Sequence, residues 1–141
     1  ILGAYQVALD RVNRGGDFQN WKPLPVPHHL NQIKTADAGS LLRELDEAIR
    51  DNQQAHAAAY VHRYGELGHS PRPLFDLLLR YAVSEDGALH AEKFYRTVTE
   101  EFQAARPAFR WRFVTGLARV TACEYGHPAP GMTEARSILR A

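Results

Sequence analysis

Apolar residues recur at intervals of three and four along most of this chain, which is the spacing of an amphipathic α-helix. The first such pattern covers residues 1–14, where Leu2, Tyr5, Leu9 and Val12 define one apolar face. No segment alternates convincingly between apolar and polar residues with a period of two, the pattern of a half-buried β-strand. We therefore predict an all-α protein.

The helical pattern is interrupted between residues 15 and 39, a segment with prolines at positions 23, 25 and 27. Proline lacks a backbone N–H donor and biases the preceding residue away from helical geometry. We predict an extended connector over residues 15–39. Because Phe18, Trp21 and Leu24 need shielding from water, we expect the connector to lie along the surface of the helical body.

Residues 40–141 are predicted to form the helical body, in which polar caps, prolines and glycines mark the helix ends. We expect Ser40 to cap the first of these helices, Gly68 to end the second, and Ser84 or Asp86 to cap the fourth. With residues 1–14, this predicts an antiparallel bundle of six or seven helices. The predicted helices of the body cover approximately residues 40–50, 52–67, 71–83, 86–104, 107–125 and 133–141.

The composition is that of a soluble globular domain. Of the 141 residues, 45% are hydrophobic and 23% are charged, which is too apolar for a disordered chain and suits one domain with a buried core. No apolar run approaches the roughly 20 residues that span a bilayer, and no basic and then apolar signal peptide opens the chain. We predict a single, soluble, cytoplasmic domain with no membrane partner.

The single cysteine, Cys123, excludes an intramolecular disulfide, a CxxC redox pair and a four-cysteine metal cage within this chain. The sequence also lacks a glycine-rich phosphate loop, GxSxG, HExxH and the calcium-loop pattern. These absences argue against nucleotide hydrolysis and serine hydrolysis. The seven histidines are then the main candidates for chemistry.

His56 is the first candidate metal ligand. On a helix over residues 52–67, it lies at the border of the face formed by Tyr60 and Tyr64, whereas His62 lies on the opposite side. We therefore expect His56 to point inward. A packed histidine that is hydrogen-bonded to a neighbour is the alternative interpretation.

His90 and Lys93 form the second candidate group. They are three residues apart, so on a helix their side chains address one region, and Asp86 precedes His90 by one turn. Asp86 is thus placed to orient the imidazole of His90. In the alternative interpretation, Asp86 caps the helix, His90 borders the core and Lys93 is a solvated cation.

These residues lie in a segment that resembles a known family. Residues 79–120, and especially the run GALHAEKFYRTVTEEF at 87–102, resemble the C-terminal region of questin oxidase-like helical proteins, in which a helix carries His, two residues and then Lys ahead of an apolar stripe. A related helical region, preceded by a run similar to NQQAHAAA at 52–59, is attached to some Rieske-type ferredoxin proteins. The resemblance covers approximately residues 40–122.

The resemblance implies a non-heme, metal-dependent oxygenase that acts on an aromatic, polyketide-like small molecule and holds iron mainly through histidines. By this resemblance His90 is a metal ligand, and Lys93 is a ligand once carboxylated, since a protonated lysine has no acceptor. Helical phase, not the resemblance, adds His56 to this set. Nothing in the chain matches the family's upstream histidines or the Rieske ligands, so we expect the chain to be the C-terminal part of a larger protein, completed by a missing N-terminal segment or a partner chain.

Two smaller motifs suggest other functions. Glu66 and His69 have the Glu-x-x-His spacing of di-iron bundles, but the second copy that such a site needs is absent. A basic run suggests phosphate contacts, yet a net charge of +1 argues against a nucleic-acid partner. The basic run consists of Arg106, Arg110, Arg112 and Arg119.

A non-catalytic role is the main alternative to the oxygenase. In that interpretation the chain is a helical module that packs against a partner chain or a missing redox domain, with Trp21, Trp111 and the apolar connector as its contact surface.

Overall fold

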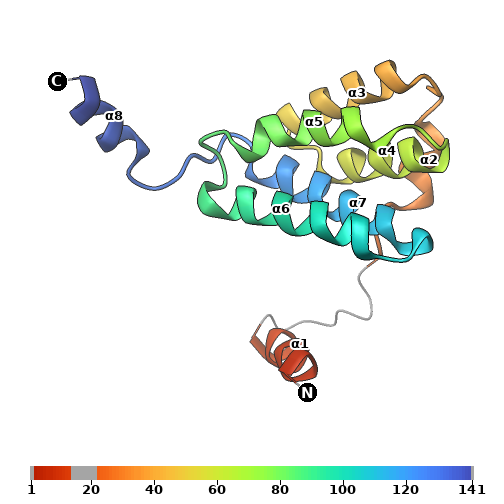
Figure 1. Cartoon of the computed structure of the whole chain (residues 1–141), viewed down its shortest axis with the longest axis horizontal. Coiled ribbons are helices and arrows are strands. Elements are labelled where there is room, and N and C mark those ends of the chain that lie inside the picture. The colour runs from red at the N-terminus through yellow and green to blue at the C-terminus, as the bar shows by residue number, and fades with distance from the viewer. Residues whose placement is uncertain (1, 14–21, 141) are drawn as a thin grey trace.

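The structure is a computed structural model that describes residues 2–13 and 22–140. These residues form eight α-helices and no β-strand, which confirms the all-α prediction (Figure 1). The helices are α1 (Leu2–Asn13), α2 (Pro27–Gln32), α3 (Ala38–Arg50), α4 (Gln54–Glu66), α5 (Pro71–Ala82), α6 (Ala88–Ala104), α7 (Pro107–Glu124) and α8 (Met132–Arg140).

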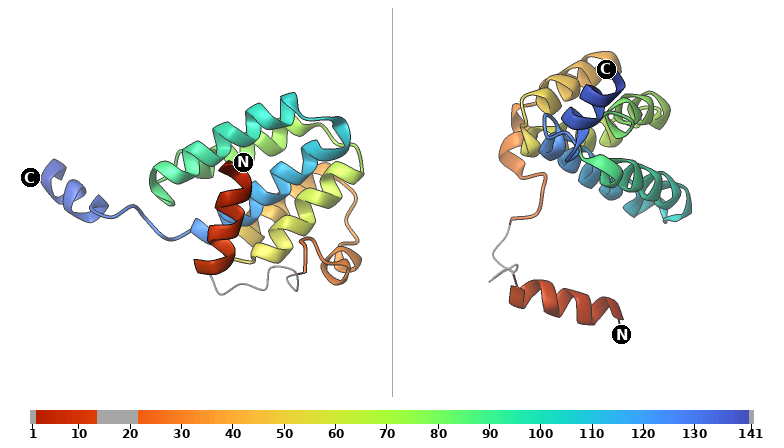
Figure 2. Two further views of the ribbon diagram at one scale, coloured as in Figure 1. Left: turned by 90° about the horizontal axis from the view of Figure 1, so that it is seen from below. Right: turned by 90° about the vertical axis from the view of Figure 1, so that its left-hand side faces the viewer.

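Helices α2–α7 form the body of the protein, with α7 at its centre. Helix α7 packs against α3, α4, α5 and α6, while the short helix α2 packs against α4 (Figure 2). Helix α1 lies apart from this body in Figure 1 and in the right-hand view of Figure 2, and α8 lies apart from it in Figure 1 and in the left-hand view of Figure 2. No helix in the described part of the chain combines the length and the apolar character needed to cross a membrane.

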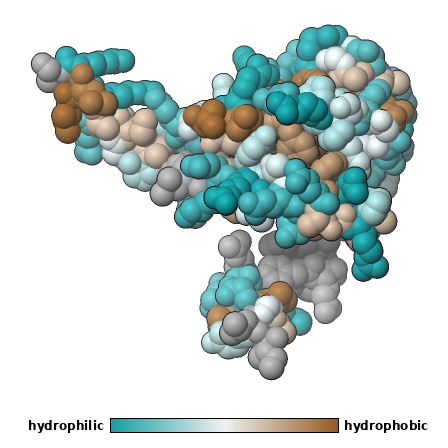
Figure 3. Space-filling model, in the orientation of Figure 1, coloured by the Kyte–Doolittle hydropathy of each residue, from teal (hydrophilic) through white to brown (hydrophobic). Residues whose placement is uncertain are grey.

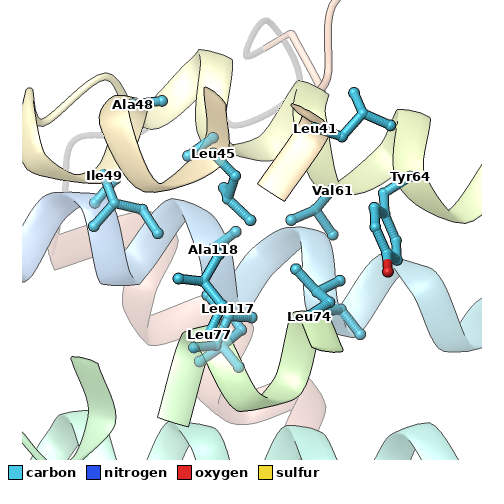
Figure 4. Close-up of a cluster of buried hydrophobic side chains, with 14 of the residues drawn as sticks. Leu41, Leu45, Ala48, Ile49, Val61, Tyr64, Leu74, Leu77, Leu117 and Ala118 are labelled. Atoms are coloured by element: carbon cyan, nitrogen blue, oxygen red, sulfur yellow. The ribbon is translucent and has the colours of Figure 1, made fainter. Parts of the chain in front are cut away.

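The core is built from aliphatic side chains of α3, α4, α5 and α7 (Figure 4). Its members on α3 recur at helical spacing, as the sequence pattern requires. On α4, Ala57, Ala58 and Ala59 are fully buried, and small side chains of this kind let α4 lie close to α7. The largest side chains with almost no exposure are Leu41, Leu45, Ile49, Val61, Tyr64, Leu74, Leu78 and Val114.

The start of α3 differs from the sequence prediction. Asp37, not Ser40, is the N-cap, and its carboxylate accepts a hydrogen bond from the backbone N–H of Ser40 at 2.8 Å. The hydrogen bonds from Ser40 lower the pKa of Asp37. The Ser40 prediction was wrong because Asp satisfies the same free N–H groups, and the helix therefore begins earlier. The predicted stop at Gly68 is confirmed: Gly68 has φ +72°, and His69 N–H bonds back to the Tyr64 carbonyl at 3.3 Å, as in a Schellman ending.

The expected caps of α6 were also wrong. Gly87, with φ +69°, occupies the N-cap position, and the Asp86 carboxylate accepts instead from the backbone N–H of Gly126 at 2.9 Å. The same loop is joined to the segment after α7 by Gly87 N–H to the His127 carbonyl and Ala129 N–H to the Glu85 carbonyl. This pairing of two loops fixes the point at which the chain leaves the body toward α8.

The region predicted as an extended connector contains the helix α2. Pro27 is the first residue of α2, a position where the missing N–H of proline removes no helical hydrogen bond. The prediction from proline content alone therefore did not distinguish a helix start from an extended chain. Residues 14–21, which include Phe18 and Trp21, lie outside the described residues, so the expectation for them stays a prediction.

Candidate functional site

The structure places the predicted metal ligands on two helices with different neighbours. His56 lies on α4, partly buried, with its ring centroid 4.4 Å from that of His29 on α2. His90 and Lys93 are both exposed on α6, and the ring of His90 lies 6.1 Å from that of Phe94. Helix α4 packs on α2, α3 and α7, whereas α6 packs on α5 and α7. The structure thus joins His56 to His29 rather than to His90 and Lys93.

Within the described residues, no group of three or more His, Cys, Asp or Glu side chains is arranged to hold a metal ion. Asp86, which the sequence suggested as a partner of His90, bonds to the backbone of Gly126. An iron site that uses His90, Lys93 and His56 therefore stays a prediction, with any further ligands to come from outside these residues.

Metal analysis tests the iron site directly. If the oxygenase prediction holds, iron co-purifies with the active protein, and His90→Ala abolishes iron binding because one ligand is lost. The matched control is His62→Ala, because His62 lies on a different face of α4 from His56 and contacts Glu66 at 3.3 Å. Active protein without bound metal, or equal metal content in both variants, contradicts the prediction.

Three histidines gather where α2 packs on α4. The ring centroids of His28 and His29 are 5.3 Å apart, and those of His29 and His56 are 4.4 Å apart. Among the described residues, the buried Nδ1 atom of His29 has no hydrogen-bond partner, while His28 Nε2 lies 3.3 Å from the amide nitrogen of Gln32. Helical phase predicted that His56 points inward, and His56 is partly buried beside His29, but nothing in the sequence pattern linked it to the pair at 28 and 29.

The histidine cluster disfavours the protonated form of His56. Burial lowers the pKa of His56 from its usual 6.5, and the nearby His29 and His28 lower it further. A histidine whose pKa is lower in the folded than in the unfolded state binds fewer protons when folded. Its contribution to stability is therefore present above pH 6.5 and is lost as the pH falls through the folded-state pKa.

We expect the free energy of unfolding to fall with acidification below pH 6.5, and His56→Gln to reduce this pH dependence because it removes the group that must be protonated. Urea unfolding at a series of pH values measures the effect. His62→Gln is the control on the same helix and is expected to leave the slope in place. If His56→Gln leaves the pH dependence of the free energy of unfolding unchanged, His56 is not the group that lowers stability at acidic pH.

A second polar cluster joins α3 to α5. The Tyr81 hydroxyl donates to Asp46 Oδ1 at 2.7 Å, and Arg50 Nη2 lies 2.9 Å from Asp46 Oδ2. Burial and the hydrogen bond to Asp46 raise the pKa of Tyr81 to about 12, so its hydroxyl stays protonated near neutral pH. The cluster thus serves as a structural clip between helices. Sequence reasoning missed it because Asp46 and Tyr81 are 35 residues apart.

The remaining sequence candidates have separate partners. Glu66 contacts His62 at 3.3 Å and Arg63 at 3.5 Å, whereas His69 Nε2 lies 2.8 Å from the carbonyl of Ala36. Glu66 thus contacts residues of its own helix, α4, whereas His69 contacts the segment that precedes α3. The structure therefore gives no support to a shared di-iron site at this pair.

Aromatic contacts account for much of the basic run on α7. The guanidinium groups of Arg106 and Arg112 lie 5.3 and 5.0 Å from the centre of the Phe109 ring, and Arg110 lies 5.3 Å from that of Phe102. Such placements are cation–π contacts, which stabilise the local surface without any ligand. Phosphate binding by this run stays an untested alternative.

Trp111, which the sequence suggested as part of a contact surface, packs against α4 within the helical body. Its ring is partly buried, and its centroid lies 5.3 Å from that of Phe102. It covers Gly65 of α4 so closely that a Cβ at Gly65 would lie 2.8 Å from Cγ and Cε3 of the indole and closer still to Cδ2. The crossing of α4 and α7 uses part of the Trp111 side chain for packing, and a contact between Trp111 and a partner stays a prediction.

The two terminal helices carry several of the most exposed large apolar side chains among the described residues. On α8, Ile138 and Leu139 are 75% and 86% exposed, and on α1, Tyr5 and Val12 are 62% and 77% exposed. Figure 3 shows hydrophobic residues on the surface of both helices. An ion pair between Arg136 and Glu85 adds to the paired loops that hold the start of α8. These helices present apolar faces that the described body leaves uncovered.

Comparisons with known proteins found no match that bears on these observations. No protein-family model, no curated protein and no solved structure matches the chain. The resemblance to questin oxidase-like proteins therefore stays a prediction.

Proposed function

We propose that this chain is a non-catalytic helical module that docks onto a partner chain through α1 and α8. The observation that supports the proposal is the contrast between the two sets of helices. Helices α3, α4, α5 and α7 bury their apolar faces in one core, whereas α1 and α8 expose theirs. In this proposal the body is an antiparallel bundle that acts as the scaffold, and the terminal helices are its binding elements.

Helix stability gives the physical reason for a partner. Helices α1 and α8 have 12 and 9 residues, and isolated helices shorter than about 12–15 residues are marginal in water. Most helical stability in proteins comes from burial of an amphipathic face. Covering one Leu or Ile side chain contributes roughly 1.5–3 kcal/mol, so a partner that covers Ile138 and Leu139 stabilises both α8 and the complex.

The attachment of α8 also favours this role. The backbone pairs between residues 85–87 and 126–129, together with the Arg136 and Glu85 ion pair, hold the start of α8 against the α5–α6 loop. A binding element held at its base loses less freedom on association than a loose tail does.

Affinity capture with surface variants that introduce a negative charge tests the proposal. We expect the tagged chain to retain a specific protein that Leu139→Asp or Tyr5→Asp releases, because a carboxylate would be buried at the contact. The matched controls are Ser137→Asp on α8 and Ala4→Asp on α1, both at exposed positions that are turned by roughly 100° or more around their helices from the tested residues. If every captured protein is retained equally by all four variants, the proposed function is wrong.

A further inference from the structure

We propose that the partner of α8 is a second copy of this chain, so that each α8 docks on the α5–α6–α7 side of the other copy. This inference rests on the proposed function and names the partner of one of its two binding elements. It is carried by an apolar crevice on the same chain that suits α8 in hydrophobicity and charge.

The receiving surface is a narrow crevice between α5, α6 and α7 with about 20 Å³ of free volume. Two exposed apolar side chains belong to this region: Val83, 70% exposed, lies between the lining residues Ala82 and Ser84, and Phe94 on α6 is 42% exposed. Phe94 also lines the crevice itself. The space suits the tip of one aliphatic side chain rather than a small-molecule ligand, whose pockets are about 300–1,000 Å³. The apolar lining consists of Tyr81, Ala82, Ala91, Phe94, Leu117, Val120 and Tyr125.

Helix α8 presents a matching ridge. Met132, Ala135 and Leu139 recur at intervals of three and four, with Ile138 beside them, and so share one face of the helix. Ile138 and Leu139, at the outer end, are the most exposed of the large apolar residues near the C-terminus.

The charges at the two surfaces are complementary. Asp86 and Glu124 line the crevice, and no Lys or Arg is among its lining residues. Helix α8 carries Arg136 and Arg140 on one flank, four residues apart and therefore on the same side. Arg136 is paired with Glu85 of its own chain, so in the proposed complex Arg140 is the cation of α8 that meets the acidic rim of the crevice.

The position of α8 favours exchange between copies. The chain leaves the body beside the α5–α6 loop, at the same end as Val83, and α8 then points away from its own body (Figures 1 and 2). Because the ridge and the crevice lie on one chain and near one end, a single two-fold axis satisfies both contacts at once. Such isologous pairs are the commonest form of homo-oligomer, and exchange of an identical element is a low-cost route to them.

Light scattering coupled to size exclusion tests the proposal on the purified chain. We expect a particle of twice 15.9 kDa. Leu139→Asp and Val83→Asp, one on each surface, are each expected to raise the dimer dissociation constant by about tenfold or more. Ser137→Asp, on the polar side of α8, is the control and is expected to leave the dimer intact. Circular dichroism of each variant confirms that the body remains folded.

Cysteine cross-linking distinguishes docking of α8 on the other copy from folding of α8 back onto its own body. One copy carries Val83→Cys and the other, with a different tag, carries Leu139→Cys, both with Cys123→Ser. A disulfide that joins the two tags supports the proposal. A monomer at all concentrations, or a dimer that neither Asp variant weakens, overturns it. If the chain is monomeric but Leu139→Asp still releases another captured protein, only the second-copy proposal fails and the proposed function stands.

Discussion

Leu45→Ala is expected to lower the free energy of unfolding by about 2–5 kcal/mol. Leu45 is 1% exposed and lies in the middle of the core among side chains from several helices (Figure 4). Truncation removes the transfer free energy of three carbon atoms and leaves a cavity whose surroundings relax only in part. Urea unfolding followed by circular dichroism measures the loss.

Leu67→Ala is the matched control for this change. Leu67 is the exposed C-cap residue of α4, so the same truncation is expected to cost about 1 kcal/mol or less. Equal losses for the two variants would mean that Leu45 does not occupy the core position described here.

Gly65→Ala is expected to destabilise the protein by about 1–3 kcal/mol, although Ala is the better helix former. The added Cβ would lie 2.8 Å from Cγ and Cε3 of Trp111 and closer still to Cδ2. The indole must then move out of its packing against Phe102, whose ring is 5.3 Å away. Thermal or urea unfolding measures the change.

Gly116→Ala provides the opposite expectation on the neighbouring helix. Gly116 lies inside α7 with open space where a Cβ would be, so the alanine gains helix propensity without a clash. We expect it to stabilise the protein by about 0.5–1 kcal/mol. The double variant Gly65→Ala with Trp111→Leu should lose less than the sum of the single losses, because both act at one contact. Stabilisation by Gly65→Ala alone would rule out the close approach of α4 and α7 at this point.

Much of the fold follows from local rules that act within a few residues. The spacing of Leu41, Leu45 and Ile49 places them on one face of a helix whatever surrounds it. Gly68 stops α4 because a positive φ has little steric cost there. The predicted helix starts at Pro71 and Pro107 also agree with the structure, because proline fits the first turn of a helix.

The sequence predictions were wrong where a local rule allowed two different structures. Pro27 is equally compatible with an extended chain and with a helix start, and the structure places α2 there. Asp86 is a good capping residue, but a backbone N–H from Gly126, 40 positions away, uses its carboxylate. In both cases a contact distant in sequence decided between outcomes that are locally similar in free energy.

For the candidate sites too, the local sequence predicted some features and only the packing of helices decided others. Helical phase indicated that His56 points inward, yet the residue that it meets, His29, belongs to a different helix. Spacing placed His90 and Lys93 together on one helix but carried no information on what lies beside them, and the structure leaves both exposed.

The sequence by itself determined the helical class, most helix boundaries and which face of each core helix is apolar, because these depend on backbone sterics and on periodicity within one segment. Only the tertiary structure decided that His29 meets His56, that Trp111 covers Gly65, and that α8 leaves the body with its apolar face uncovered. Those features depend on how helices pack against one another, and packing is set by side-chain shape across segments far apart in the chain.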